Sequence, residues 1–248
     1  MIGMFTTLLG PAGRSVKPPL MHAMTLPPGQ LLIEGFPRFG AHLARPAPVV
    51  PADPVITIRG AVTEAVDVRL ATLATLARRA LSADFHCVAG WSATNLCWEG
   101  VPFEAFYRTI IGPALVPGAE VTHVVFRGLD GYRSVVWMED ALADGVIIAD
   151  RLDGRPLDGD HGAPVRLVSP AQYGYISTKH LCCIEVHTGE PEDARASGIS
   201  ARLLRPHPRA RVAEEERHGS LPGWLVRPFY RALKAPLLYL CARGRGSR

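Results

Sequence analysis

The sequence has few cysteines, and their spacing excludes several common kinds of site. There are five, comprising one adjacent pair and three isolated residues: Cys87, Cys97, Cys182, Cys183 and Cys241. An odd number without a CxxC motif predicts neither a disulfide framework nor a zinc ribbon. The lack of CxxCH excludes a covalently attached haem. A reducing compartment is the simpler interpretation, and we expect the protein in the cytoplasm.

Long hydrophobic segments and repeats are lacking as well. The apolar stretch at the N-terminus is well short of the roughly 20 residues that cross a bilayer as a helix. It also lacks a preceding basic region and a twin arginine. We therefore interpret residues 1–33 as an irregular arm and not as a signal peptide. No repeat at solenoid spacing is visible.

Charge is spread unevenly along the chain. The net charge is +4, and residues 201–248 carry 11 Lys/Arg and three Glu, a net of +8, which leaves 4 − 8 = −4 for residues 1–200. A basic tail can meet nucleic acid, acidic lipid or an acidic partner. Alternatively, its arginines form salt bridges with the acidic body. We expect no nucleic-acid partner, and we leave open a weak docking of the tail to a membrane or a partner.

Short strand-like runs outnumber helical ones. Hydrophobic residues make up 48% and charged residues 20%, an ordinary globular composition, and 24 Gly with 22 Pro predict many turns. Runs without strict βαβ alternation favour an α+β fold that is mixed and strand-rich. Strands are predicted at 55–62, 121–127, 132–138, 145–150, 165–170 and 181–189, and residues 84–92 are predicted to be a strand that runs into a turn, with Cys87 where the two meet. The Gly-Leu-Asp-Gly turn at 128–131 predicts a hairpin of 121–127 and 132–138. Helices are predicted at 67–81, at 102–111 with Gly112-Pro113 as its stop, and at 138–144.

Two of these expectations concern helix boundaries. Residues 67–81 place their apolar side chains largely on one helical stripe, with Asp67 at the N-cap position. Near the C-terminus, Pro228 and Pro236 are expected to interrupt any helix in residues 224–244. We predict one catalytic domain at 34–189 and a basic C-terminal extension at 190–248.

Three segments carry the chemistry, in a fixed order along the chain. They are Asp84-Phe85-His86-Cys87-Val88-Ala89-Gly90-Trp91-Ser92, His161-Gly162-Ala163-Pro164-Val165-Arg166-Leu167-Val168, and Tyr173-Gly174-Tyr175-Ile176-Ser177-Thr178-Lys179. An Asp130-Gly131-Tyr132 turn lies between the first two. Together, over residues 34 to 187, they resemble the molybdopterin-binding domain of the sulfite-oxidase superfamily. The resemblance implies a sulfite-oxidase-type fold and a molybdenum–molybdopterin cofactor.

Cys87 is the candidate metal ligand and catalytic residue. In the family that this chain resembles, two pterin sulfurs and one protein thiolate hold the molybdenum. A thiolate is a soft ligand that must be deprotonated, so it needs a cationic or metal-rich setting. From its residue type alone, Cys87 is better interpreted as a small buried hydrophobe, as most free cysteines are. The resemblance favours the metal ligand instead. The other four cysteines are interpreted as packing residues.

Five residues are candidates for binding the pterin or its phosphate. Arg166 offers a planar fork of donors that suits phosphate oxygens, and His161 can donate a ring N–H. Ser177, Thr178 and Lys179 form a short run that could cup an anion. By resemblance, these five match the family's cofactor-binding positions. The alternative is that His161 is only a turn residue and Arg166 only a surface cation.

A loop at residues 33–40 falls where the family places another pterin contact. Bacterial periplasmic methionine-sulfoxide reductase subunits carry an Asn and a Tyr–Glu pair there, whereas this sequence has Glu34 and Pro37-Arg38. Arg38 is included as a candidate cofactor-binding residue. Gly128 stands where those subunits have a Thr, and we assign it no role. Trp91, Asn95, Asp130 and Tyr132 are near enough in sequence to line a substrate cleft.

The resemblance implies an oxidoreductase that performs two-electron oxygen-atom transfer at a sulfur or nitrogen centre. Its substrate would be a small or sulfur-containing molecule, and a separate partner would carry the electrons. One alternative is a non-catalytic pterin-binding or structural module that keeps the fold. Another is a Cys–His hydrolase that uses Cys87, which is poorer because neighbouring strand residues such as His86 point to opposite faces.

Overall fold

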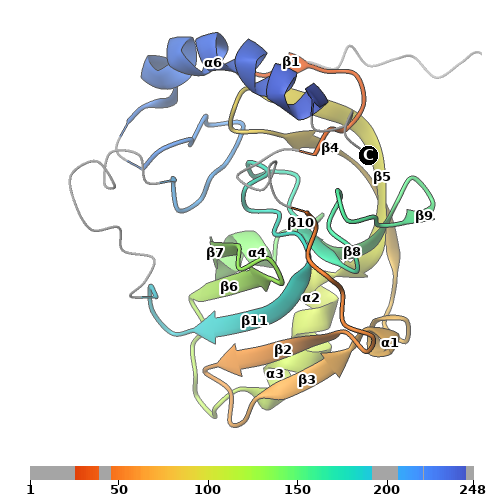
Figure 1. The fold of residues 1–248 in the computed structure, drawn as a ribbon. Helices are drawn as coiled ribbons and strands as arrows, with labels where there is room; N and C mark the ends of the chain where they lie inside the picture. Colours follow the sequence, from red (N-terminus) through yellow and green to blue (C-terminus); the bar gives the residue numbers. More distant parts are fainter. Residues whose placement is uncertain (1–25, 39–45, 192–205, 220, 244–248) are drawn as a thin grey trace, which may run out of the picture.

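Two β-sheets and a set of mostly short helices make up the α+β fold of the protein (Figure 1). The computed structural model describes residues 26–38, 46–191, 206–219 and 221–243. One sheet has five strands and the other has six. The strand-rich, mixed α+β architecture predicted from the sequence is confirmed.

The five-stranded sheet is ordered β3 (Val66–Arg69), β2 (Val55–Gly60), β11 (Leu181–His187), β6 (His123–Gly128) and β7 (Arg133–Trp137). Strand β11 runs parallel to β2 and antiparallel to β6. Alternating side chains of β2 and β11 are fully buried, as expected for strands with one face on a core. Strands β6 and β7 form the hairpin expected from the sequence.

The six-stranded sheet follows β1 (Leu31–Leu32), β5 (Trp91–Pro102), β8 (Ile147–Leu152) and β10 (Arg166–Val168). Strand β4 (Arg79–His86) pairs with β5, and β9 (Arg155–Pro156) pairs with β8. The β4–β5 hairpin is long, and its turn begins at Cys87. The sequence therefore correctly places Cys87 where a strand meets a turn.

The helices differ greatly in length. Short ones are α1 (Leu70–Leu73), α2 (Phe103–Phe106), α3 (Gly112–Ala114) and α4 (Met138–Ala141), with a π-helical turn at Tyr107–Ile111 between α2 and α3. The helix predicted at 102–111 thus forms and continues beyond the Gly112-Pro113 expected to stop it. Helix α6 (Gly223–Arg243) is much longer, with 21 residues.

The helix predicted at residues 67–81 is wrong. Asp67 lies in β3, where its carboxylate accepts a hydrogen bond of 2.7 Å from the Thr57 hydroxyl across the β2–β3 pair. Only residues 70–73 are helical, and β4 begins at Arg79. The apolar stripe belongs to two different cores, because Leu73 packs in one and Leu81 packs against the other. Pairing of β3 with β2 and of β4 with β5 therefore outweighs the local helical periodicity.

The expectation that Pro228 and Pro236 interrupt the C-terminal helix is also wrong. Both prolines lie inside α6. Each removes one backbone donor from the helix, but both are on its exposed side. A carbonyl that loses its partner there can be hydrated, so a long helix tolerates the loss.

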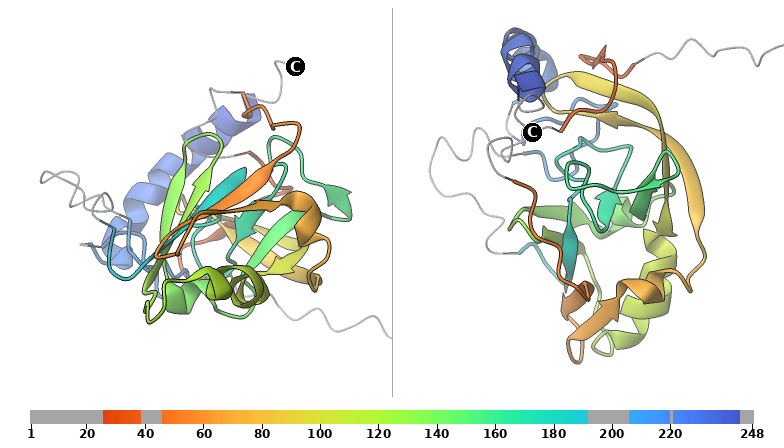
Figure 2. Two further views of the ribbon diagram at one scale, coloured as in Figure 1. Left: turned by 90° about the horizontal axis from the view of Figure 1, so that it is seen from below. Right: turned by 45° about the vertical axis from the view of Figure 1, so that its right-hand side comes forward.

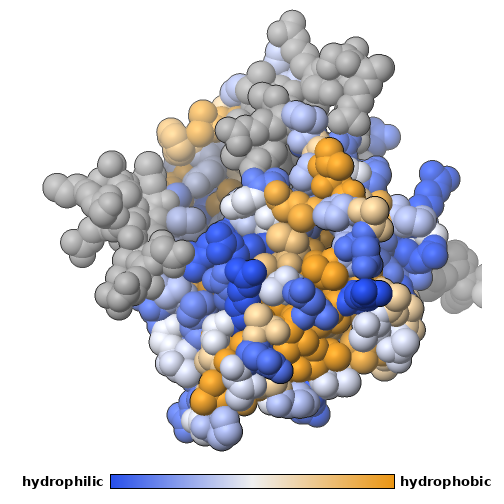
Figure 3. All heavy atoms as spheres, turned by 60° about the horizontal axis from the view of Figure 1, so that its bottom comes forward, coloured by the Kyte–Doolittle hydropathy of each residue, from blue (hydrophilic) through white to orange (hydrophobic). Residues whose placement is uncertain are grey.

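Two hydrophobic cores lie between these elements. The first involves β2, β6, β11 and α2, and it includes Ile58, Phe103 and Phe126. The second underlies the six-stranded sheet and includes Cys87 and Trp98. Figure 3 shows the surface at the end of the molecule that carries β2, β3 and α3, where hydrophobic residues form a patch among hydrophilic ones. Within the described parts of the chain, no helix is long and apolar enough to cross a membrane.

Candidate cofactor site

Cys87 is held in a tight turn between β4 and β5. The Cys87 N–H donates to the Trp91 carbonyl (2.8 Å), and the Gly90 N–H donates to the Cys87 carbonyl (2.9 Å). Gly90 has φ +90°, a conformation that favours glycine. The turn thus presents the Cys87 side chain from the end of a two-stranded ribbon.

Side chains from distant segments fix this turn. The Gln30 amide donates to the Cys87 carbonyl (3.2 Å) and accepts from the Ser92 hydroxyl (3.1 Å). The His86 ring nitrogen Nδ1 lies 2.7 Å from the same hydroxyl. From the C-terminal extension, the buried guanidinium of Arg217 donates to the Val88 carbonyl. These contacts limit the positions that the Cys87 sulfur can take.

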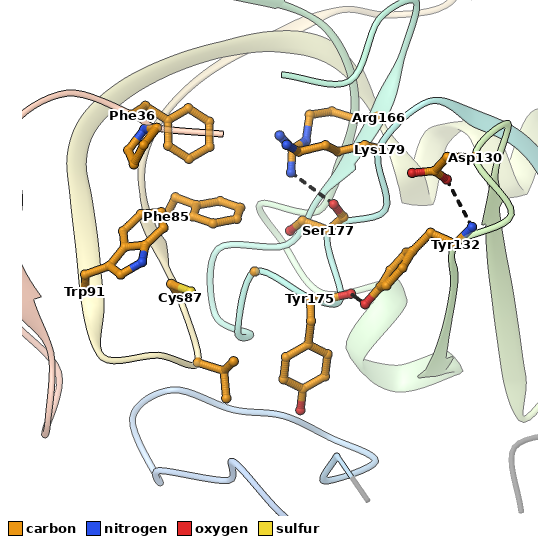
Figure 4. Close-up of a pocket in the computed structure, with 13 residues that line it drawn as sticks. Phe36, Phe85, Cys87, Trp91, Asp130, Tyr132, Arg166, Tyr175, Ser177 and Lys179 are labelled. Atoms are coloured by element: carbon orange, nitrogen blue, oxygen red, sulfur yellow. Dashed lines mark hydrogen bonds between the residues drawn. The ribbon is translucent and has the colours of Figure 1, made fainter. Parts of the chain in front are cut away.

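Cys87 lines a cavity of about 210 Å³. Figure 4 shows Cys87, Phe85 and Trp91 on one side, with Arg166, Ser177 and Lys179 across from them. Tyr132 and Asp130 lie beyond the cations, and Tyr175 lies below Ser177 in this view. The full lining comprises Phe36, Pro37, Phe85, Cys87, Val88, Trp91, Asp130, Tyr132, Arg166, Gly174, Tyr175, Ser177 and Lys179.

Arg166 is completely buried at the start of β10 and is not a surface cation. Its guanidinium donates to three backbone carbonyls, those of Leu167 (3.3 Å), His161 (2.9 Å) and Ser177 (3.0 Å). It also lies over the rings of Phe85 and Trp98, 5.5 and 5.2 Å from their centroids. Burial lowers the pKa of Arg166 to about 9. Among the described residues, no carboxylate forms an ion pair with this group.

Lys179 brings a second cation to the same wall. Its amine donates to the backbone carbonyl of Asp160 (2.6 Å). Burial, followed by the positive charges of Arg166 and Arg38, lowers the Lys179 pKa to about 7, against a smaller opposing effect of Asp160 and Asp130. At the Lys179 amine, the neighbouring positive charges therefore outweigh the neighbouring carboxylates.

The remaining predicted residues differ in whether they line the cavity. Ser177 lines it, and its hydroxyl accepts from the Ser169 N–H (3.1 Å). Thr178 is fully buried outside the lining, with its hydroxyl 2.7 Å from that of Ser134. Arg38 pairs with Asp160 at 3.5 Å and follows the lining residue Pro37.

His161 supports the cavity from behind. Its Nδ1 lies 2.8 Å from the Asp158 carboxylate and its Nε2 lies 3.0 Å from the Phe36 carbonyl. The ring also stacks on Phe36, with 5.0 Å between centroids. In this arrangement both ring nitrogens contact the protein, and His161 positions Phe36, which does line the cavity.

The polar end of the cavity combines a carboxylate and two phenols. The Asp130 carboxylate accepts from the Tyr132 N–H (3.0 Å), and the Tyr132 hydroxyl donates to the Tyr175 carbonyl (2.6 Å). Burial, followed by the charge of Asp130, raises the Tyr132 pKa to about 12, so its phenol is neutral near pH 7. Trp91, Asp130 and Tyr132 line the cavity as the sequence suggested, whereas Asn95 is exposed on β5.

Several lining and supporting residues were not found from the sequence. Phe36, Phe85 and Tyr175 line the cavity. Phe85 and Tyr175 lie inside the quoted motifs and Phe36 lies in the 33–40 loop, so their aromatic character is a signal that could have indicated them. Gln30 and Arg217 could not be found in this way, because they reach the turn from 57 and 129 residues away.

The residues present fit an anionic ligand that carries a soft metal. One thiol lies 5% exposed among apolar side chains at one side of the cavity. Across from it, two buried cations meet without a carboxylate paired to Arg166. A phosphate would supply the missing negative charge, and thiolate sulfur is a ligand that soft metals prefer.

The other described cysteines do not form a second centre. Cys87, Cys97, Cys182 and Cys183 form no disulfide. Burial and the charge of Glu185 raise the pKa of Cys183 to about 11. Within the described ranges, no three or more His, Cys, Asp or Glu residues cluster in a way that could hold a metal ion.

Comparison with known proteins matches residues 42–194 to a family model described as an oxidoreductase molybdopterin-binding domain. Over 174 residues the chain is 28% identical to the protein-methionine-sulfoxide reductase catalytic subunit MsrP of Pseudomonas syringae pv. tomato, covering 60% of this chain and 49% of that one. Over 98 residues it is 32% identical to the uncharacterized oxidoreductase YuiH of Bacillus subtilis, covering 40% and 47% respectively. It is 49% identical over 88 residues to an NADPH nitrate reductase of Fusarium oxysporum, covering 32% and 10%.

The fold is similar to that of a solved structure, the sulfane dehydrogenase SoxCD from Paracoccus pantotrophus. The TM-score is 0.52 at 19% sequence identity, over 81% of this chain and 62% of that one. At this identity the likeness shows the fold alone. The chain spans about half of the length of MsrP and YuiH and about a tenth of the nitrate reductase.

Proposed function

Because the chain belongs to the family of oxidoreductase molybdopterin-binding domains, we propose that it holds a molybdenum–molybdopterin cofactor and catalyses two-electron oxygen-atom transfer at a sulfur or nitrogen centre. The names of two relatives, a methionine-sulfoxide reductase and a nitrate reductase, support both kinds of centre. The substrate is then a small or sulfur-containing molecule. The cytoplasmic location stays a prediction.

One observation carries the proposal: a single cysteine faces a buried cationic wall across a small cavity (Figure 4). A structural cysteine needs no such wall. Cations buried without full compensation are costly, and they are retained where an anion binds. The pairing of a soft ligand with an anion-binding wall matches a metal carried by a phosphorylated organic group.

When bound, the cofactor supplies a metal centre that exchanges two electrons and an oxygen atom with the substrate. Cys87 contributes the protein thiolate, and the contacts of Gln30 and Arg217 with its turn hold that sulfur in place. Lys179, Ser177 and the remaining N–H groups of Arg166 bind the phosphate. Phe85 and Phe36 exclude water from the apolar side of the cavity.

His161 and Arg38 act indirectly in this proposal. His161 fixes the Phe36 carbonyl and ring, and Arg38 compensates Asp160, which would otherwise weaken the positive potential at Lys179. Thr178 acts through its hydrogen bond with Ser134, which holds the run that carries Ser177 and Lys179. On the polar side, Asp130 and the neutral phenol of Tyr132 offer contacts to a polar substrate.

Metal and cofactor analysis of the purified protein tests the proposal. We expect stoichiometric molybdenum, extractable pterin, and turnover with an artificial electron donor or acceptor, because a separate partner supplies the electrons. Pterin without turnover would instead support the non-catalytic module. A protein without either molybdenum or pterin, isolated from cells that make the cofactor, would contradict both.

The Cys–His hydrolase hypothesis gains no support from the histidines that it requires. The His86 ring contacts the Ser92 hydroxyl, and the His161 ring contacts Asp158 and Phe36. Hydrolytic activity that persists in metal-free protein would revive it.

A further inference from the structure

The C-terminal extension has two parts with different surroundings. Residues 206–219 pack onto the domain, where Ala210 and Val212 are almost fully buried. The Tyr173 N–H donates to the Ala210 carbonyl (2.9 Å), and the Val212 N–H donates to the Ala171 carbonyl (3.0 Å). This part is a strap that packs on the domain. Helix α6, which follows it, is different.

Polar contacts attach one side of α6 to the strap, residues 206–219. The Arg227 guanidinium donates to Glu215 (Nε to Oε1 3.1 Å), and the Tyr230 hydroxyl lies 2.8 Å from His218 Nε2. Arg217 stacks on Tyr230 at 5.1 Å and also donates to the Val88 carbonyl beside Cys87. These contacts fix which face of the helix points away from the protein.

That outward face is apolar. Its large hydrophobic side chains are exposed by 67%, 52%, 61%, 36% and 56% for Trp224, Leu225, Phe229, Leu233 and Tyr239. At about 100° per residue, they fall within one half of the helix circumference. Arg227 and Tyr230 fall in the other half. An amphipathic helix in a globular protein normally turns its apolar face inward, and α6 does the reverse.

Strand β1 extends this apolar area. Leu31 and Leu32 are exposed by 49% and 62%. Figure 1 and the right-hand view of Figure 2 place β1 beside α6 at the same end of the molecule. Arg227 Nε lies 3.5 Å from the position a Cβ would take at Gly29, just before β1. We call the outward side chains of α6 together with Leu31 and Leu32 the α6 surface.

The charge of this segment has one sign. Residues 219–248 contain no Asp or Glu, and their cations are Arg227, Arg231, Lys234, Arg243, Arg245 and Arg248. Aromatic and aliphatic residues on one face, accompanied by Lys and Arg, are typical of helices that lie in the interface of an anionic membrane. A second copy of the chain would bring two such basic segments together, which is unfavourable.

We propose that the α6 surface binds anionic phospholipid, with α6 lying in the plane of the membrane interface. The family model ends at residue 194, so the surface lies outside the part that the chain shares with its family. Tyr230 and Arg217 connect α6 directly to the Cys87 turn. Docking of α6 therefore places the Cys87 turn on the side of the protein that faces the lipid headgroups.

Vesicle co-sedimentation of the whole protein tests the proposal. The vesicles contain phosphatidylcholine alone or phosphatidylcholine with phosphatidylglycerol. We expect binding to the anionic vesicles to be at least about tenfold tighter and to weaken with salt. The double variant Leu225→Glu with Phe229→Glu should weaken that binding about a hundredfold or more. The control is Val49→Glu, at a position 91% exposed and outside the surface, and it should bind as the wild type does.

Trp224 provides a second readout that does not depend on the double variant. Its emission should shift to shorter wavelength on adding anionic vesicles, and Trp224→Phe should lose that shift while Trp91, Trp98 and Trp137 remain. No binding to anionic vesicles, or equal binding by the double variant, would overturn the proposal. A third outcome would also overturn it: the wild type does not bind vesicles but self-associates in light scattering, and the double variant abolishes the self-association. A second copy of the chain would then cover the α6 surface.

Discussion

At the scale of single residues, Lys179 links the electrostatics of the cavity to its ligand. Its amine is buried beside Arg166 and Arg38, and its pKa falls from 10.5 to about 7. A bound anion would offset the neighbouring positive charges and favour the protonated amine. Anion binding at this wall should therefore take up a proton near neutral pH, and it should weaken as the pH rises above 7.

The same shift predicts how the stability of the cofactor-free protein depends on pH. Between the folded pKa of about 7 and the unfolded value of 10.5, the unfolded chain binds more protons at Lys179. The free energy of unfolding should therefore rise with pH in this range. Urea unfolding from pH 7 to about 8.5, below the pKa of about 9 of Arg166, should show a steeper rise for the wild type than for Lys179→Met. Equal slopes of the free energy of unfolding against pH in the two proteins would contradict the burial of the Lys179 amine.

Arg166 is expected to stabilise the fold as well as to bind the cofactor. Arg166→Ala would leave the carbonyls of Leu167, His161 and Ser177 without their side-chain donor. We expect a loss of about 3 kcal/mol in the free energy of unfolding, together with reduced cofactor loading. The control Arg209→Ala removes a partly exposed ion pair with Asp140, which solvent screens, and should destabilise the protein less. A similar loss in both variants would show that Arg166 is not buried as described.

At the scale of elements, the segment that carries Ser177 and Lys179 depends on a close approach at Gly174. A Cβ at Gly174 would lie 2.1 Å from the Phe85 ring, and the Gly174 N–H donates to the His86 carbonyl at 2.7 Å. The segment can dock on β4 only without a side chain there.

Gly174→Ala should displace the Phe85 ring and so disturb both sides of the cavity. We expect a destabilisation of about 1–3 kcal/mol and a lower pterin content per protein. Gly189→Ala is the matched control, because a Cβ there meets nothing within 4 Å. Wild-type pterin content in Gly174→Ala would mean that the position of Phe85 does not matter for loading.

The elements that the sequence predicts correctly are those decided locally. The β6–β7 hairpin follows from two β-branched runs around a Gly-Leu-Asp-Gly turn. The failure at 67–81 arises because residues 66–69 pair with β2 and residues 79–86 pair with β5, and this pairing outweighs the helical periodicity of the segment. For the site, the motifs identify Cys87, Ser177 and Lys179, while the turn contacts of Gln30 and Arg217 depend on tertiary packing.

At the scale of the whole molecule, the family-like domain and the C-terminal extension meet at the cofactor site. Arg217 joins Tyr230 of α6 to the Val88 carbonyl. The predicted salt bridges between tail and body are realised in one case, where Arg209 pairs with Asp140 and Glu139. Arg211 and Arg227 pair instead with glutamates of the extension itself. The boundaries 34–189 and 190–248 stay predictions.

The most direct test is molybdenum X-ray absorption on the loaded wild type and on Cys87→Ser. We expect three sulfur ligands in the wild type and two in the variant, because only the protein thiolate is lost. Pterin content should be largely retained, since Arg166, Ser177 and Lys179 are unchanged, while turnover collapses. The same number of sulfur ligands in both proteins would contradict the assignment of Cys87 as the metal ligand.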